Sequence, residues 1–236
     1  MDKTRAARPI PLALTMLVAF FSALAALAVS NGMDAHAHGN AAHHATVPVA
    51  QTSSAPTAKQ AALRAEMRRL WEDHITWARL AVISLTTDSP DTSATVARLL
   101  RNQTDIGNAI KPFYGPAAGN ELTRQLRAHI LIAADVIAAA KAGDQAKLTE
   151  AQARWAKNGD EIAELLASVN PRHWKPAAMK AELRTHLRLT TDEVVARLQG
   201  KWNADVAAYD KIHRHALHLS DLLADGLVEQ FPKRFR

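Results

Sequence analysis

Apolar residues recur every three or four positions from Lys59 to Phe231, which is the period of amphipathic α-helices. In the first such stretch, one stripe collects Leu63, Leu70, Trp71, His74, Trp77, Ala78, Ala81, Val82 and Leu85. No segment combines strict alternation with β-branched residues, so the pattern predicts no sheet.

Turn and capping residues divide this region into six predicted helices. The first helix ends at the turn from Asp88 to Asp91, and the second ends at Lys111, before Pro112 and the turn at Gly115-Pro116. The third ends at Gly143, with Asp144 as the cap of the fourth, which ends at Asn170-Pro171. Pro176 opens the fifth, Gly200 separates it from the sixth, and the sixth ends at Gln230 before Pro232. We therefore expect an all-α, six-helix bundle built from three helical hairpins over residues 59–236. One domain of this length is large enough to bury a core.

A short phrase occurs three times at nearly equal spacing, which indicates a duplicated hairpin. Its copies are Trp71-Glu72-Asp73-His74-Ile75, Leu126-Arg127-Ala128-His129-Ile130 and Leu183-Arg184-Thr185-His186-Leu187. The second and third copies also match at Asp135 and Asp192, Ile137 and Val194, Ala139 and Ala196, and Gly143 and Gly200.

Residues 1–30 carry the pattern of a signal peptide or membrane anchor. Lys3, Arg5 and Arg8 precede an uncharged apolar run from Ile10 to Val29. This run is about long enough for a transmembrane helix, and its basic flank favours the cytoplasmic side. We expect an exported, periplasmic or otherwise extracytoplasmic protein, anchored in the inner membrane if the segment is not cleaved.

Residues 31–58 are predicted to form a flexible linker, because they hold Gly, Pro, Ser and Thr with little apolar periodicity. Four histidines lie in it: His36, His38, His43 and His44. A flexible histidine-rich tract can gather metal weakly, whereas a soluble linker that happens to contain histidine explains the same composition.

The three repeated histidines lie on apolar stripes, so they should face the core. Polar residues on the helix that follows each histidine can satisfy its ring nitrogens. The second predicted helix offers Asn102, Asp105 and Asn108, and the fourth offers Trp155 and Asn158, with Asp160 and Glu161 nearby. The sixth offers Trp202, Asp205, Tyr209 and His213. Trp202, Asp205, Tyr209 and His213 share one face, which is predicted to be interior. We expect Asp205 or Tyr209 to contact one of the core histidines.

Two readings of these histidines remain open. In one, each forms a hydrogen bond inside its own hairpin and fixes helix register. In the other, the imidazoles converge on a zinc, copper or iron ion, with a neighbouring carboxylate completing the site. The candidate metal ligands are His74, His129, His186, Asp105, Asp205 and His213.

A second histidine group follows on the last helix, where His213, His215 and His218 lie between Asp210 and Asp221. A one-turn pair can bind a transition metal weakly, but a solvated helical face is the simpler reading, especially for His215. The chain has no Glu-x-x-His motif, so a ferritin-like di-iron centre is disfavoured.

Charge and composition exclude several other chemistries. The chain has no Cys, which removes disulfides and thiolate catalysis, and it lacks a phosphate loop and a nucleophile elbow. The net charge is +6 for 236 residues, and removing residues 1–30 leaves +4. This mild basic excess favours contact with anionic envelope surfaces over nucleic acid.

The run from Leu99 to Gly115, with Trp71 to His74 before it and Leu126 to Ile132 after it, resembles an uncharacterised family of exported bacterial helical proteins. The resemblance covers residues 63–232. Some members carry automatic glycosyltransferase labels, but nucleotide-sugar transferases need an α/β scaffold and this pattern predicts no strands.

These patterns predict a non-catalytic envelope protein that binds a metal ion or small ligand in a polar-lined bundle. A helical protein-interaction module with purely structural histidines is the alternative. A metal-dependent hydrolase, with His74, His129 and His186 around the ion, is the third reading.

Overall fold

The computed structural model describes residues 55–236, so the predicted signal or anchor and most of the predicted linker lie outside the described residues. The described part is all-helical and holds no strand. Its five α-helices and one 3₁₀-helix are α2 (Ala58–Thr87), α3 (Thr92–Ala142), α4 (Gln145–Val169), α5 (Pro176–Leu198), α6 (Trp202–Gln230) and η1 (Pro232–Phe235).

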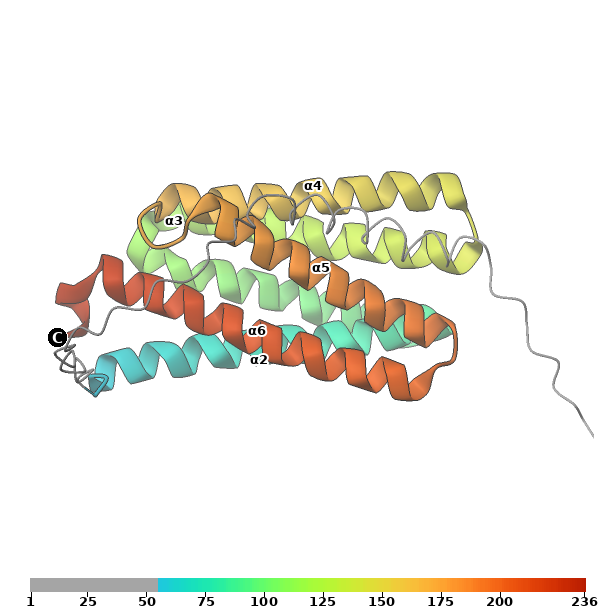
Figure 1. The fold of residues 1–236 in the computed structure, drawn as a ribbon, viewed down its shortest axis with the longest axis horizontal. Helices are drawn as coiled ribbons and strands as arrows, with labels where there is room; N and C mark the ends of the chain where they lie inside the picture. Colours follow the sequence, from blue (N-terminus) through green and yellow to red (C-terminus); the bar gives the residue numbers. More distant parts are fainter. Residues whose placement is uncertain (1–54) are drawn as a thin grey trace, which may run out of the picture.

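Helix α3 is divided at Gly115, whose φ of 82° and ψ of 169° are not helical. The two arms fold back on each other, as Figure 1 shows, and they approach closely where Gly107 meets Gly119. A Cβ on Gly107 would stand 2.6 Å from the Gly119 carbonyl oxygen, so this crossing requires residues without side chains.

The predicted helix end at Lys111 is wrong, because the first arm continues through Pro112 to the kink at Gly115. A proline in the last turn removes only one backbone donor, and the helix stops three residues later. Pro116 then opens the second arm, a position that suits its fixed φ.

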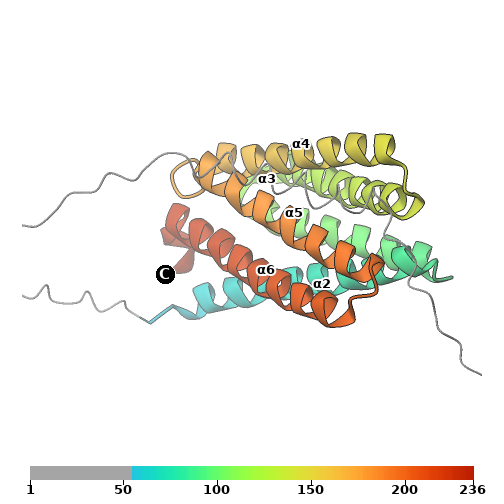
Figure 2. The same cartoon turned by 45° about the vertical axis from the view of Figure 1, so that its right-hand side comes forward.

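The helices close into a ring. Helix α2 packs on α3, α3 on α4, α4 on α5, α5 on α6, and α6 again on α2. Both views show α2 and α6 side by side (Figures 1 and 2). The hydroxyl of Thr57, which caps α2, donates to the Phe235 carbonyl over 2.6 Å, so the start of α2 lies beside η1.

Three helix ends at one end of the bundle use the left-handed conformation. Gly143 and Gly200, which the repeat matched, have φ values of 69° and 68° at the ends of α3 and α5. Asp88, which ends α2, lies 55 residues before Gly143 and has a φ of 54°. The repeat therefore extends to the first copy, where aspartate replaces glycine.

The core has two apolar parts separated by a polar layer. The larger part lies toward η1 and includes Leu70, Trp174 and Leu227. The other lies toward the left-handed helix ends, where Val82, Ile137 and Val194 pack together. These three residues have the same 55- and 57-residue spacings as the repeated histidines, so equivalent positions of the repeat meet in the interior.

None of the helices within residues 55–236 combines the length and the apolar character that crossing a bilayer requires.

Candidate functional site

The three repeated histidines meet in the middle of the bundle. His74 on α2, His129 on α3 and His186 on α5 are 4%, 4% and 8% exposed, which confirms the prediction that they are buried. The ring centre of His186 lies 6.0 Å from that of His74 and 6.0 Å from that of His129. Residues far apart in the sequence thus form one interior layer.

Each histidine faces a polar side chain located 29 residues later. The partners are Gln103 for His74, Asn158 for His129 and His215 for His186. The backbone carbonyl four residues before each histidine also accepts a hydrogen bond from the partner helix. These bonds join Asn102 to Leu70, Asn158 to Gln125 and His215 to Glu182. The donor is the residue 29 positions after the histidine in the second and third pairs and its neighbour Asn102 in the first, so the three registers agree to within one residue.

The amide of Gln103 contacts His74. Gln103 Nε2 lies 3.2 Å from His74 Nδ1, and it also donates to the Leu99 carbonyl over 2.9 Å and to Asn102 Oδ1 over 3.1 Å. Because an amide nitrogen carries two hydrogens, Gln103 shares them among three neighbours.

The amide of Asn158 fixes the tautomer of His129. Asn158 Nδ2 donates to the Gln125 carbonyl over 3.2 Å, which turns its side-chain oxygen toward the histidine. His129 Nδ1 donates to that oxygen over 2.8 Å. The neutral ring of His129 therefore keeps a lone pair on Nε2.

His186 links the interior layer to a histidine near the surface. Its ring stacks on that of His215 with centres 6.2 Å apart, while its own Nδ1 is buried without a hydrogen-bond partner. The His215 side chain is only 9% exposed, and its Nε2 donates to the Glu182 carbonyl over 3.2 Å. The prediction that His215 faces solvent is thus wrong, because stacking and a backbone bond bury it.

Burial keeps the three inner imidazoles neutral. It lowers the pKa of His74 to about 4 and that of His129 to about 4. Burial also lowers the pKa of His186 well below its usual value, and the neighbouring His129, His74 and His215 lower it in the same direction. A proton on one ring disfavours a proton on the next.

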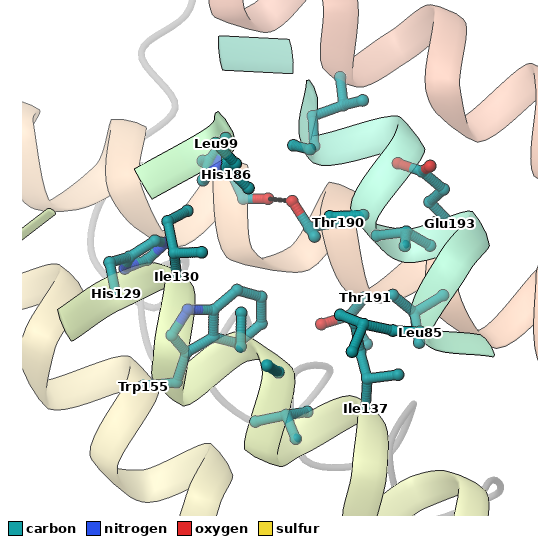
Figure 3. A pocket seen from close by; sticks show the side chains of 18 of the residues that line it. Leu85, Leu99, His129, Ile130, Ile137, Trp155, His186, Thr190, Thr191 and Glu193 are labelled. Atoms are coloured by element: carbon teal, nitrogen blue, oxygen red, sulfur yellow. Dashed lines mark hydrogen bonds between the residues drawn. The ribbon is translucent and has the colours of Figure 1, made fainter. Parts of the chain in front are cut away.

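A cavity of about 60 Å³ adjoins the histidine layer. In Figure 3, His129 and Trp155 lie on one side of it, and Thr190, Thr191 and Glu193 lie on the other. Both threonine hydroxyls donate to carbonyls of their own helix, so toward the cavity they can only accept. Most of the remaining lining is aliphatic.

Asp205 does not contact the core histidines, so that prediction is wrong. It is 2% exposed, as predicted, but its carboxylate accepts hydrogen bonds from Arg79 and Arg197. Burial opposes the charged form of Asp205, yet these guanidinium groups lower the pKa of its carboxyl. Glu193 also accepts from Arg79 over 2.8 Å, and burial raises the pKa of Glu193.

The predicted interior face of α6 is only partly buried. Trp202 is 59% exposed, because it lies at the start of the helix, where its ring stacks on Arg197 with 5.6 Å between the guanidinium and the ring centre. Tyr209 is half-buried and has Arg79 over its ring at 5.3 Å. The tyrosine prediction is also wrong, since Arg79 and His213, and not one of the three core histidines, contact the Tyr209 ring.

Two further candidate ligands lie away from the histidine layer. Asp105 is exposed on α3. His213 is half-buried and pairs through Nε2 with Glu72 over 2.8 Å. Within residues 55–236, no group of three or more His, Asp or Glu side chains is arranged to hold a metal ion.

Gln103 and His215 complete the layer, although neither was predicted from the sequence to belong to it. Each lies 29 residues after a repeated histidine, the same separation as between His129 and Asn158, and this spacing could have identified them. An anti-parallel helix pair with a fixed turn keeps such a separation, so the second arm of the repeat could have been aligned this way.

No family model, no curated protein and no solved structure matches this chain. The resemblance to exported bacterial helical proteins therefore stays a prediction.

Proposed function

We propose that the protein binds a small neutral molecule in the cavity beside the histidine layer, within an exported and membrane-tethered domain made of three copies of one helical hairpin. The observation that carries this proposal is the buried Nδ1 of His186, which has no partner beside a cavity lined by three neutral imidazoles. Buried polar atoms in proteins are normally satisfied, so an unsatisfied one next to a space favours a ligand or water there.

The tautomer of His129 defines what the ligand would offer. His129 keeps a lone pair on Nε2, so the layer presents an acceptor beside an apolar lining. A molecule with one hydroxyl or amide group and an aliphatic remainder suits this combination. Charged ligands are disfavoured, because the rings stay neutral and the lining is mostly apolar.

The contacts of the rings argue against the three-histidine metal centre. A metal ion needs lone pairs from the imidazoles at one point, whereas His74 and His129 each direct Nδ1 at an amide. In the part of the chain that the structure describes, no group of three or more His, Asp or Glu side chains is arranged to hold an ion. The small-ligand half of the prediction is therefore the one we retain.

A titration with neutral alcohols from ethanol to butanol tests the proposal. We expect the side-chain nitrogen resonances of His129 and His186 in NMR spectra to shift and saturate, and filling the cavity with Ala133→Leu to abolish the response. The control Asp105→Asn changes only the exposed side of α3 and should respond like wild type. Histidine resonances that no alcohol moves would leave a purely structural polar layer, as in the interaction-module alternative.

A further inference from the structure

One end of the bundle holds the whole basic excess of the domain. Residues 1–54 contain three Lys/Arg and two Asp/Glu, which leaves 26 basic and 21 acidic residues from 55 to 236, a net charge of +5. The end that bears η1 is built from residues 55–62, 108–120, 166–178 and 226–236, and these segments carry Lys59, Lys111, Arg172, Lys175, Lys233, Arg234, Arg236 and one acid, Glu229.

Three hydrogen bonds hold these four segments together. Thr57 bonds Phe235, Arg234 donates to the Pro112 carbonyl over 2.8 Å, and Gln230 donates to the Val169 carbonyl over 3.1 Å. Figures 1 and 2 both place the start of α2, the bend of α3, the α4–α5 turn and the C-terminal residues at the same end. The net charge of these segments is therefore +6 on one face.

The opposite end is electrically balanced. Its segments, residues 82–95, 137–149 and 195–207, hold four basic and four acidic residues. Asp205 and Arg197 are paired there, and so are Asp88 and Lys141. The charge asymmetry thus runs along the bundle axis and does not reflect a uniformly basic surface.

We infer that the η1 end of the bundle docks on an anionic lipid surface. Six of its seven basic side chains belong to exposed residues, and only Glu229 supplies a fixed acid, which His173 already contacts over 2.6 Å. Each basic side chain near such a surface strengthens binding by about fivefold. Exposed basic side chains contributed by four separate segments suit an extended anionic surface such as a membrane.

The position of the chain before α2 supports a membrane over a nucleic acid. The described residues begin at this same end, so residues 1–54, with the basic flank and apolar run expected to be a signal or anchor, join the domain beside the basic residues. The 25 residues from 30 to 54 can separate the two by at most about 85 Å. An anchored chain would therefore keep this end within reach of the lipid.

Arg234 shows how this end is ordered beneath its charges. Its guanidinium lies 4.9 Å from the ring centre of Phe113 while it bonds Pro112, and Phe113 packs in turn on Phe231 and Phe235. The basic side chain is thus held on an aromatic base. Holding it there reduces the ordering cost when it meets a phosphate group.

Site-specific labels on the full chain test the inference. Because the chain has no Cys, Ala177→Cys at the basic end and Ala146→Cys at the opposite end each give a single fluorescent label on an exposed first turn. The labelled proteins are placed on nanodiscs of phosphatidylcholine, with or without phosphatidylglycerol, that carry a headgroup quencher. We expect the label at residue 177 to be quenched only on discs that contain phosphatidylglycerol, and this quenching to disappear at high salt. The label at residue 146 should be quenched weakly and to the same extent on both kinds of disc.

Charge reversal provides the matched comparison. Lys175→Glu with Lys233→Glu should lower the ratio of docked to free domain by about 20-fold or more, whereas Lys147→Glu with Lys201→Glu should leave it unchanged. Equal quenching at both ends, or quenching that ignores lipid charge, overturns the inference. So does binding of duplex DNA through the same lysines without any response to phosphatidylglycerol.

The docking experiment does not test the cavity proposal, since no cavity residue is altered. It also distinguishes docking of the η1 end from insertion of the N-terminal segment. If residues 10–29 do not insert, the protein stays off neutral discs and still binds the anionic ones.

Discussion

His129 and Asn158 form the shortest histidine–amide bond of the interior layer, with 2.8 Å between His129 Nδ1 and the amide oxygen. The bond joins α3 to α4 and leaves neither group exposed, since the two residues are 4% and 5% accessible. The His129 Nδ1–H therefore depends on Asn158 for its acceptor.

Asn158→Ala should therefore leave the His129 N–H without an acceptor. We expect the free energy of unfolding to fall by about 1–3 kcal/mol, the usual cost of an unsatisfied buried group. Urea denaturation followed by circular dichroism measures it. Asn108→Ala, on the exposed side of α3, is the control, and equal stability of the two variants would contradict the assignment.

Stability should fall as the pH drops from about 6.5 toward about 4. The pKa values of His74 and His129 are about 4 in the folded protein, below the usual value of 6.5, so the unfolded chain binds more protons in this window. Each histidine makes its full contribution to the free energy of unfolding above about pH 6.5. That contribution, about 3 kcal/mol for each, is lost once the pH is below the folded pKa.

Urea unfolding at several pH values gives the slope. His129→Gln should reduce it, because one titrating group is removed, while His218→Gln should not, because the His218 side chain is 62% exposed. A slope that His129→Gln does not change would show that other groups control acid unfolding.

Asp205→Asn should destabilise the protein by about 3 kcal/mol, since it leaves Arg79 and Arg197 with a lost charge partner in a buried setting. Thermal unfolding measures the loss. Asp210→Asn, an exposed neighbour on α6, should change stability by less than about 0.5 kcal/mol. A melt of Asp205→Asn equal to wild type would mean that the arginines are satisfied by water.

Asp88→Gly should stabilise the protein by about 0.5–1 kcal/mol, because glycine adopts the left-handed conformation without strain and the exposed ion pair with Lys141 contributes little. The comparison variant is Gly143→Asp, which places an aspartate at the equivalent helix end. It should lower the free energy of unfolding, whereas Asp88→Gly should raise it. Chemical denaturation of both variants is the measurement, and a loss of stability in Asp88→Gly would show that the ion pair outweighs the strain.

The buried histidines, the left-handed glycines and the helix periods were all accessible from the sequence, because apolar spacing and duplication are local or periodic signals. The partner of Asp205 was not. Arg79 lies 126 residues away on the neighbouring α2, and a long side chain reaches across a helix interface that periodicity does not specify. Trp202 was placed inside for its size, yet the first turn of a helix can leave even a large ring outside.

The histidines of the repeat are identical in sequence but not in surroundings. Gln103 presents an amide nitrogen to His74, and Asn158 presents an oxygen to His129. His215 presents a second ring to His186. The second arm of each copy thus sets the contacts of the first, and three different side chains at the same repeat position give the interior a direction.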